Sequence, residues 1–230
     1  MSEFQQLSTE LTQFTGRVRL FPLPGFVMFP HVVQPLHAFE PRYRKLIDDA
    51  LKGDRLVAMA TLAPGWEADY EGRPALYPTA CLSRIISHHR LADGTINLLV
   101  AGVQRIHIAS ELPPWRSYRE ARVELRADSY TAAAPQHLAA LRSELRERFR
   151  TLLPQLADAR EQVDHLLGAD LPLGVLCDLV GYMIDVDLSE KMALLDERDV
   201  DRRARHLLKL LKRAAKEDGP SNFPPPFSMN

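Results

Sequence analysis

Residues 17–30 read RVRLFPLPGFVMFP, a stretch in which short apolar runs are separated by prolines. We expect a strand at 17–21, a rigid turn at Pro22–Gly25 and a second apolar strand at 26–29, because proline fixes φ and glycine permits a positive φ. A further strand is expected at 32–36, interrupted by Pro35. Prolines at this density restrict strands to edges and bulges, so the pattern favours a strongly bent sheet.

Working outward, the signals up to residue 130 remain strand-like, with one helix. Pro41 at a first-turn position and Gly53 after the apolar pattern predict that helix. Asp93-Gly94 predicts a hairpin. At 119–127, alternation predicts that Ala121, Val123, Leu125 and Ala127 face inward. Strands are expected at 55–62, 80–90, 95–102, which continues through 103–112, and 119–127. Residues 15–130 therefore predict a six- or seven-stranded β pseudo-barrel with one helix.

After residue 130 the apolar spacing becomes helical. An amphipathic helix is expected at 135–153, ended by Pro154, and shorter helices at 158–167 and 172–184. Asp187 and Glu190 have the spacing of a capping box, and a last long helix follows Val200. The fold class is therefore α+β, with a helical-bundle subdomain at 131–216. The proline-rich residues 217–230 are expected to form a flexible tail.

Composition limits the function classes. The 230 residues are 46% hydrophobic and 26% charged, with a net charge of −1, which is typical of globular proteins and argues against attraction to nucleic acid or membranes. Seven Lys or Arg residues between 202 and 216 complement the dipole of the last helix, and the alternative interpretation is a basic face for an acidic partner. The start of the chain has no export signal and the longest apolar stretches are too short to span a bilayer, so a cytoplasmic location is expected.

The sequence contains no recognisable catalytic or metal-binding motif. It lacks the common nucleotide-binding, metalloprotease and serine-hydrolase motifs. His88 and His89 are neighbours on a strand and should point to opposite faces, and His37 with Glu40 lacks a third ligand. Cys81 and Cys177 lie in apolar contexts typical of small core residues. We therefore expect no catalytic residue, no metal and no cofactor.

Three strings resemble one known family. Residues 18–30 with 35–44, which contain Phe39-Glu-Pro-Arg-Tyr43, resemble the start of the substrate-binding N-terminal domain of Lon proteases. The strand pair around Asp93-Gly94 and the run to Ile108 resemble its second signature. Residues 176–211 resemble its helical half. The resemblance covers about residues 15–215.

This resemblance implies a pseudo-barrel followed by helices, and a role in recognising unfolded or partly folded polypeptides, or a partner protein. The ATPase and protease modules of Lon do not follow before Asn230, so the expectation is a stand-alone domain without ATP hydrolysis or proteolysis. Phe39, Glu40, Pro41, Arg42 and Tyr43 are implied to be a family signature, for which we expect a structural role.

Two irregular segments are candidates for a polypeptide-binding surface, because loops and aromatic side chains dominate recognition. Trp66 and Tyr70 lie in a long loop at 63–79. Phe26, Met28 and Phe29 lie between proline turns, although a place in the barrel core is an equally good interpretation.

The working hypothesis is a non-enzymatic recognition module. An RNA-binding pseudo-barrel that uses the basic run at 202–216 is one alternative, which the neutral charge disfavours. The second alternative is a hydrolase whose catalytic residues are distant in sequence and come together only in the folded protein, so that no motif reveals them.

Overall fold

A computed structural model describes residues 14–130, 134–152 and 170–215. The predicted helix at 158–167 and the predicted tail at 217–230 lie outside these residues. The chain divides into two compact units, a β-unit that ends at Arg126 and a helical unit that begins at Ala127. No helix among the described residues is both long and apolar enough to cross a bilayer.

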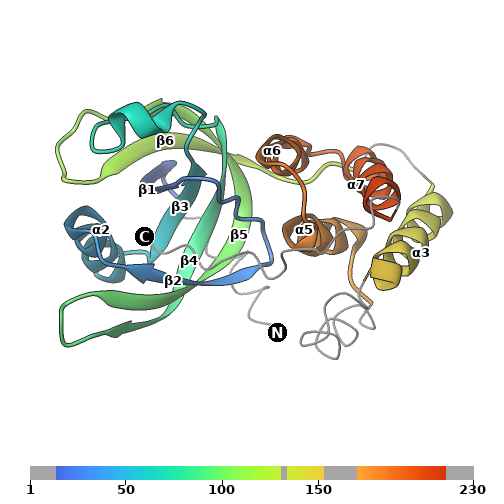
Figure 1. Ribbon diagram of the computed structural model, residues 1–230, viewed down its shortest axis with the longest axis horizontal. Coiled ribbons are helices and arrows are strands. Elements are labelled where there is room, and N and C mark those ends of the chain that lie inside the picture. Colours follow the sequence, from blue (N-terminus) through green and yellow to red (C-terminus); the bar gives the residue numbers. More distant parts are fainter. Residues whose placement is uncertain (1–13, 131–133, 153–169, 216–230) are drawn as a thin grey trace. The chain divides into compact units, whose positions relative to one another are not determined.

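The β-unit is a mixed six-stranded sheet that closes on itself (Figure 1). Its strands run in the order β2-β5-β4-β3-β1-β6, and β5 also pairs with β6, so five strands form a ring and β2 extends it along β5. Among these six strands β1 and β3 form the one parallel pair, and β2 and a helix connect them. The strands are β1 (Arg17–Leu23), β2 (Val33–Ala38), β3 (Leu56–Thr61), β4 (Thr79–Arg90), β5 (Ile96–Glu111) and β6 (Arg119–Arg126).

Small and branched side chains fill the ring, which explains how so few strands can close. The interior cluster includes Val18, Leu20, Leu56, Ala58, Ala60, Ala80, Leu82, Ile106, Ala121 and Val123. Gly102 on β5 allows the segment before β2 to cross closely, since a Cβ there would overlap the carbonyl oxygen of Phe29. The chain can therefore fold tightly over the sheet at this position.

The helix α2 (Pro41–Leu51) begins and ends where the sequence predicts. Its buried side chains, Tyr43, Leu46, Ile47 and Ala50, recur at helical spacing and form its inner face. A short 3₁₀ helix, η2 (Trp66–Asp69), lies within the predicted loop at 63–79.

Several local predictions for the β-unit are wrong. Strand β1 continues through Pro22, which pairs in register with Ala60 instead of starting a turn. Residues 26–29 form no strand. Leu125 and Ala127, both expected to face inward, are exposed, Leu125 by 39%, although Leu125 pairs in register with Ile106 of β5.

The helical unit consists, in its described part, of four helices, among which α7 contacts the other three. They are α3 (Pro135–Leu152), α5 (Leu173–Met183), α6 (Leu188–Asp196) and α7 (Val200–Ala214). The capping box predicted at Asp187 does not form, since its side chain makes no capping bond. Asp199 caps α7 instead, by accepting a hydrogen bond from the Arg202 amide.

Candidate functional site

The Phe39–Tyr43 signature is the centre of a network that joins three parts of the β-unit. The Tyr43 ring stacks on Phe21 of β1 at 4.2 Å between centroids, and its hydroxyl donates to the Pro22 carbonyl at 2.9 Å. Burial raises the pKa of Tyr43. Its hydroxyl therefore stays protonated and keeps α2 attached to β1.

Glu40 and Arg42 of the signature hold the loop at 63–79 through Tyr70. The Glu40 carboxylate accepts hydrogen bonds from Arg42 Nε and from the Tyr70 hydroxyl, both at 2.8 Å. The Arg42 guanidinium lies 4.9 Å from the ring centroids of both Tyr43 and Tyr70, a cation–π geometry on each side. Burial and the bond to Glu40 raise the pKa of Tyr70, so that hydroxyl remains a donor. Pro41 occupies the first turn of α2.

Trp66 and Tyr70 are therefore presented on an anchored loop. Their rings make an edge-to-face contact with centroids 5.5 Å apart, and both side chains are partly exposed. The loop is held again at its far end, where Arg73 donates to Glu111 at 2.6 Å. This arrangement leaves an aromatic pair partly accessible to solvent on a restrained backbone.

The other predicted segment does not form a surface. Met28 and Phe29 are only 1% and 0% exposed, and Phe26 is partly exposed, with its carbonyl accepting from Thr61 Oγ1 at 2.7 Å. Met28 and Phe29 thus belong to the core of the β-unit, and only Phe26 of the three is accessible. The core interpretation holds for the two buried residues.

An apolar surface that the sequence reasoning missed lies on the outer side of β2 and β5. Val33 and Leu99 are 48% and 38% exposed, and Pro35 lies opposite Leu99 in register. Ile86, also exposed, is the extra residue of a β-bulge in β4 opposite Leu99. Beyond them Phe39 is exposed and stacks on His37, with centroids 6.2 Å apart. We name Val33, Pro35, Ile86, Leu99 and Phe39 the β2–β5 face.

At the start of β2 an apolar and a polar residue face the opposite way from what alternation predicts. In β2 the apolar Val33 is exposed, whereas the polar Gln34 is buried at 7% exposure. Alternation alone assigns apolar residues to the core. The outward position of Val33 therefore places an apolar side chain on the surface, where a polar one is expected. Single exposed apolar residues are ordinary, but neighbours on adjacent strands form a patch.

The histidines and cysteines considered as metal ligands or nucleophiles do not come together in a site among the described residues. His88 and His89 are exposed and lie opposite consecutive residues of β5, so their side chains point to opposite faces. His37 bonds Asn97 across the strands at 2.7 Å. Cys81 and Cys177 are buried, and burial raises the pKa of Cys177 to about 12. In the parts of the chain that the structure describes, no cluster of His, Cys, Asp or Glu could hold a metal ion.

In its described part, residues 202–215, the basic run is not a continuous surface. Arg203 is fully buried, and Arg205 pairs with Asp201 within α7 at 2.7 Å. Lys212 and Arg213 lie 3.9 and 3.6 Å from Glu144 and Glu190. Helix termini and ion pairs thus account for much of the run.

Comparisons with known proteins agree with one another. Residues 17–213 match the family described as ATP-dependent protease La (LON) substrate-binding domain. The chain is 28% identical over 194 residues to Lon protease 2 of Myxococcus xanthus and 29% identical over 196 residues to Lon protease 2 of Thermus thermophilus. These alignments cover 84% and 83% of this chain but only 23% of each relative. The chain thus spans about a quarter of the length of the curated relatives it matches.

Solved structures show the same fold. The N-terminal domain of Mycobacterium avium complex Lon protease matches with a TM-score of 0.65 and 22% identity, covering 85% of this chain and 98% of that one. A Lon N-terminal domain protein from Xanthomonas campestris matches with a TM-score of 0.60 and 21% identity, covering 84% and 97%. The pseudo-barrel with a helical region is the fold of these domains, and the chain belongs to the Lon substrate-binding domain family.

Proposed function

We propose that this protein binds apolar segments of unfolded polypeptides on the β2–β5 face, without hydrolysing ATP or peptide bonds itself. The observation that carries the proposal is the cluster of exposed apolar side chains, Val33, Ile86 and Leu99, on three neighbouring strands. The family to which the chain belongs is described by substrate binding, which supports a polypeptide as the occupant.

The energetics suit a weak and general binder. Covering apolar surface contributes roughly 25 cal/mol per Å², part of which offsets the entropy lost on association. The strands beneath the face are packed against the core, because Val100 and Ile85 point inward with almost no exposure. A client can therefore dock without ordering the protein, and affinity should depend little on salt.

Two leucines of equal exposure provide a matched test. Leu99 lies in the β2–β5 face at 38% exposure, and Leu125 lies at the end of β6 at 39%. With a labelled, reduced and carboxymethylated lactalbumin as the client, Leu99→Ser should weaken binding about fivefold, which corresponds to about 1 kcal/mol of lost apolar burial. Leu125→Ser should leave binding unchanged. Equal effects of the two substitutions would remove the support for this face.

Trp66 and Tyr70 form the second part of the proposed binding surface. The pair is accessible and restrained by Glu40 and Arg42, and aromatic side chains are effective anchors in interfaces. Replacing Trp66 with Ala should weaken the same client further. A full effect of Leu99→Ser without any effect of Trp66→Ala would limit the surface to the β2–β5 face.

A further inference from the structure

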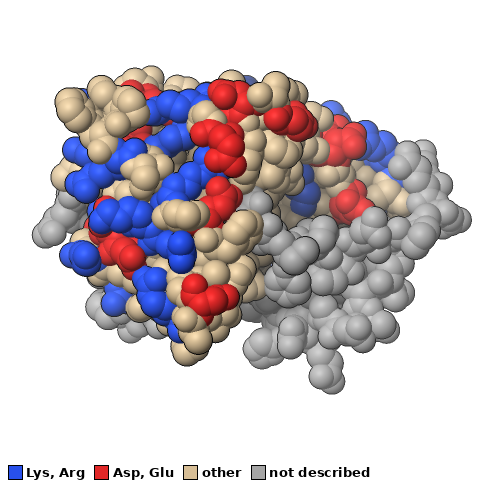
Figure 2. All heavy atoms as spheres, turned by 60° about the vertical axis from the view of Figure 1, so that its left-hand side comes forward, with Lys and Arg blue, Asp and Glu red and all other residues tan. Residues whose placement is uncertain are grey.

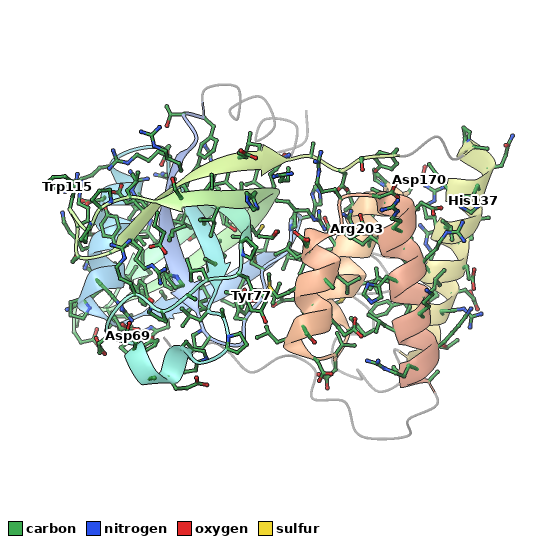
Figure 3. The ribbon with its side chains drawn as sticks, turned by 90° about the horizontal axis from the view of Figure 1, so that it is seen from above. Asp69, Tyr77, Trp115, His137, Asp170 and Arg203 are labelled. Atoms are coloured by element: carbon green, nitrogen blue, oxygen red, sulfur yellow. The ribbon has the colours of Figure 1, made fainter. Side chains whose placement is uncertain are left out.

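Trp115 has the largest exposed fraction among the large apolar side chains of the described residues, 80%. It lies in the loop between β5 and β6, directly after Pro113 and Pro114, and at the outer edge of the β-unit in Figure 3. Its amide donates to the Pro113 carbonyl at 2.8 Å, closing a tight turn. Two prolines and this bond restrict the backbone, so the indole is presented without a large entropic cost.

The following residues fasten the loop to α2 through one carboxylate. Asp49 accepts hydrogen bonds from Lys45 Nζ and from the Tyr118 hydroxyl, each at 2.8 Å, and lies 3.6 Å from the Arg116 guanidinium. The hydrogen bond from Lys45, with that from Tyr118, lowers the pKa of Asp49 despite partial desolvation. The carboxylate therefore stays charged and holds the loop next to Trp115.

Around this loop the cations point to solvent and their carboxylate partners lie beneath them. The side chain of Lys45 is 50% exposed and that of Asp49 only 16%. The same holds for Arg17, at 53%, above Glu120, at 10%. Arg17 also lies opposite the exposed Arg122 in register. Figure 2 shows Lys and Arg side chains gathered on the face of the β-unit turned toward the viewer.

We propose that Trp115, together with Lys45, Arg116, Arg17 and Arg122, docks an acidic segment of a partner protein that carries an apolar anchor. We name these five residues the Trp115 surface. Tryptophan and arginine are the residue types that contribute most to protein interfaces, and outward cations complement carboxylates on the partner. This surface shares no residue with the β2–β5 face, and its proposed function does not depend on client binding there.

A protein segment fits this surface better than a single-stranded nucleic acid. Nucleic-acid strands bind along grooves in which several aromatic rings stack successive bases. Trp115 is the one exposed aromatic side chain in the described loop between β5 and β6, so a strand of stacked bases would find a single ring there.

The test uses fluorescence anisotropy of a short labelled peptide in which glutamates flank a Leu-Phe pair. The full chain should bind it, Trp115→Ala and Arg122→Glu should each weaken binding about tenfold or more, and added salt should weaken it as well. Trp115→Phe should restore part of the affinity. Circular dichroism of each variant verifies the fold, and Lys209→Glu on α7 is the control, because Lys209 is also exposed.

Control peptides and a nucleic-acid probe define the results that would overturn the proposal. The same peptide with lysines in place of glutamates should not bind, and neither should the glutamate peptide with Gly-Ser in place of Leu-Phe. Equal affinity of wild type and Trp115→Ala would overturn the proposal. So would Trp115-dependent binding of labelled oligouridylate in preference to the acidic peptide, which would assign the surface to nucleic acid.

Discussion

The buried guanidinium of Arg203 on α7 donates two parallel hydrogen bonds to the carboxylate of Asp128, at 2.9 and 2.7 Å. Asp178 of α5, itself fully buried, lies 3.5 Å from Arg203 Nε. The start of the helical unit, at Asp128, is thereby attached to helix α7 through Arg203, which is labelled in Figure 3. Ser129 adds to this attachment by bonding the backbone of Arg198 and Val200.

The Arg203 pair predicts a large loss on removal of one partner. Asp128→Asn should lower the free energy of unfolding by about 2 kcal/mol, because the buried guanidinium loses its bidentate carboxylate partner and keeps only Asp178 as a counter-ion. Urea unfolding measures the change. Asp170→Asn is the control, because Asp170 pairs with Arg142 but is 86% exposed, and exposed pairs contribute below about 1 kcal/mol. Similar losses for both variants would show that the buried pair has no special role.

Lys191 predicts a rise of stability in mild alkali. Its ammonium donates to the last turn of α5 at the Tyr182 carbonyl, and burial lowers the pKa of Lys191 to about 8, with Asp185 opposing the shift. Between pH 8 and 10.5 the unfolded lysine binds more protons than the folded one, so the free energy of unfolding should increase with pH. In Lys191→Met this increase should be lost, as measured by urea unfolding across that range. An unchanged pH dependence would contradict the lowered pKa.

Glu111 predicts a loss of stability in acid. Burial disfavours its charge, but hydrogen bonds from Arg119 and Arg73 outweigh burial and lower its pKa below 4.5. The stabilisation is complete above that ordinary value and is lost as the pH falls through the lower, folded-state pKa. Thermal unfolding of Glu111→Gln should therefore show a weaker dependence on pH below 4.5 than wild type. Parallel curves would exclude this carboxylate as a contributor.

The Glu40–Tyr70 hydrogen bond predicts a coupling between the signature and the loop at 63–79. In a Trp115→Phe background, Trp66 is the only tryptophan. Adding Glu40→Gln should then increase acrylamide quenching of Trp66 about twofold, because a neutral amide is a weaker acceptor for Tyr70 and Arg42. Lys52→Gln, at an exposed position after α2, should not change the quenching. Unchanged quenching in Glu40→Gln would mean that other contacts hold the loop.

Local signals predicted the elements well where a single residue type fixes the backbone. Pro41 and the glycine after α2 gave its bounds, and the Asp93-Gly94 turn gave the hairpin between β4 and β5. The strand signal failed at Pro22, which β1 tolerates inside the sheet. A proline is tolerated in a strand where its missing N–H would not have bonded a neighbouring strand. Whether that holds at Pro22 depends on how the strands pair in the folded sheet.

The candidate site was less predictable, because its contacts join distant residues. Glu40 and Tyr70 are 30 positions apart, and no local pattern indicates that the signature restrains that loop. The β2–β5 face depends on a bulge that places Ile86 beside Leu99, and on register that turns Val33 outward. A one-residue change of register would exchange the buried and exposed sets.

Client binding on the β2–β5 face is the central claim, and amide chemical-shift mapping by NMR tests it most directly. With reduced, carboxymethylated lactalbumin added to the isotope-labelled chain, the largest shifts should occur at residues 33–39, 86–87 and 97–101. In Leu99→Ser these shifts should shrink, while in Leu125→Ser they should persist. Shifts confined to other surfaces, or no shifts at saturating client, would contradict the account.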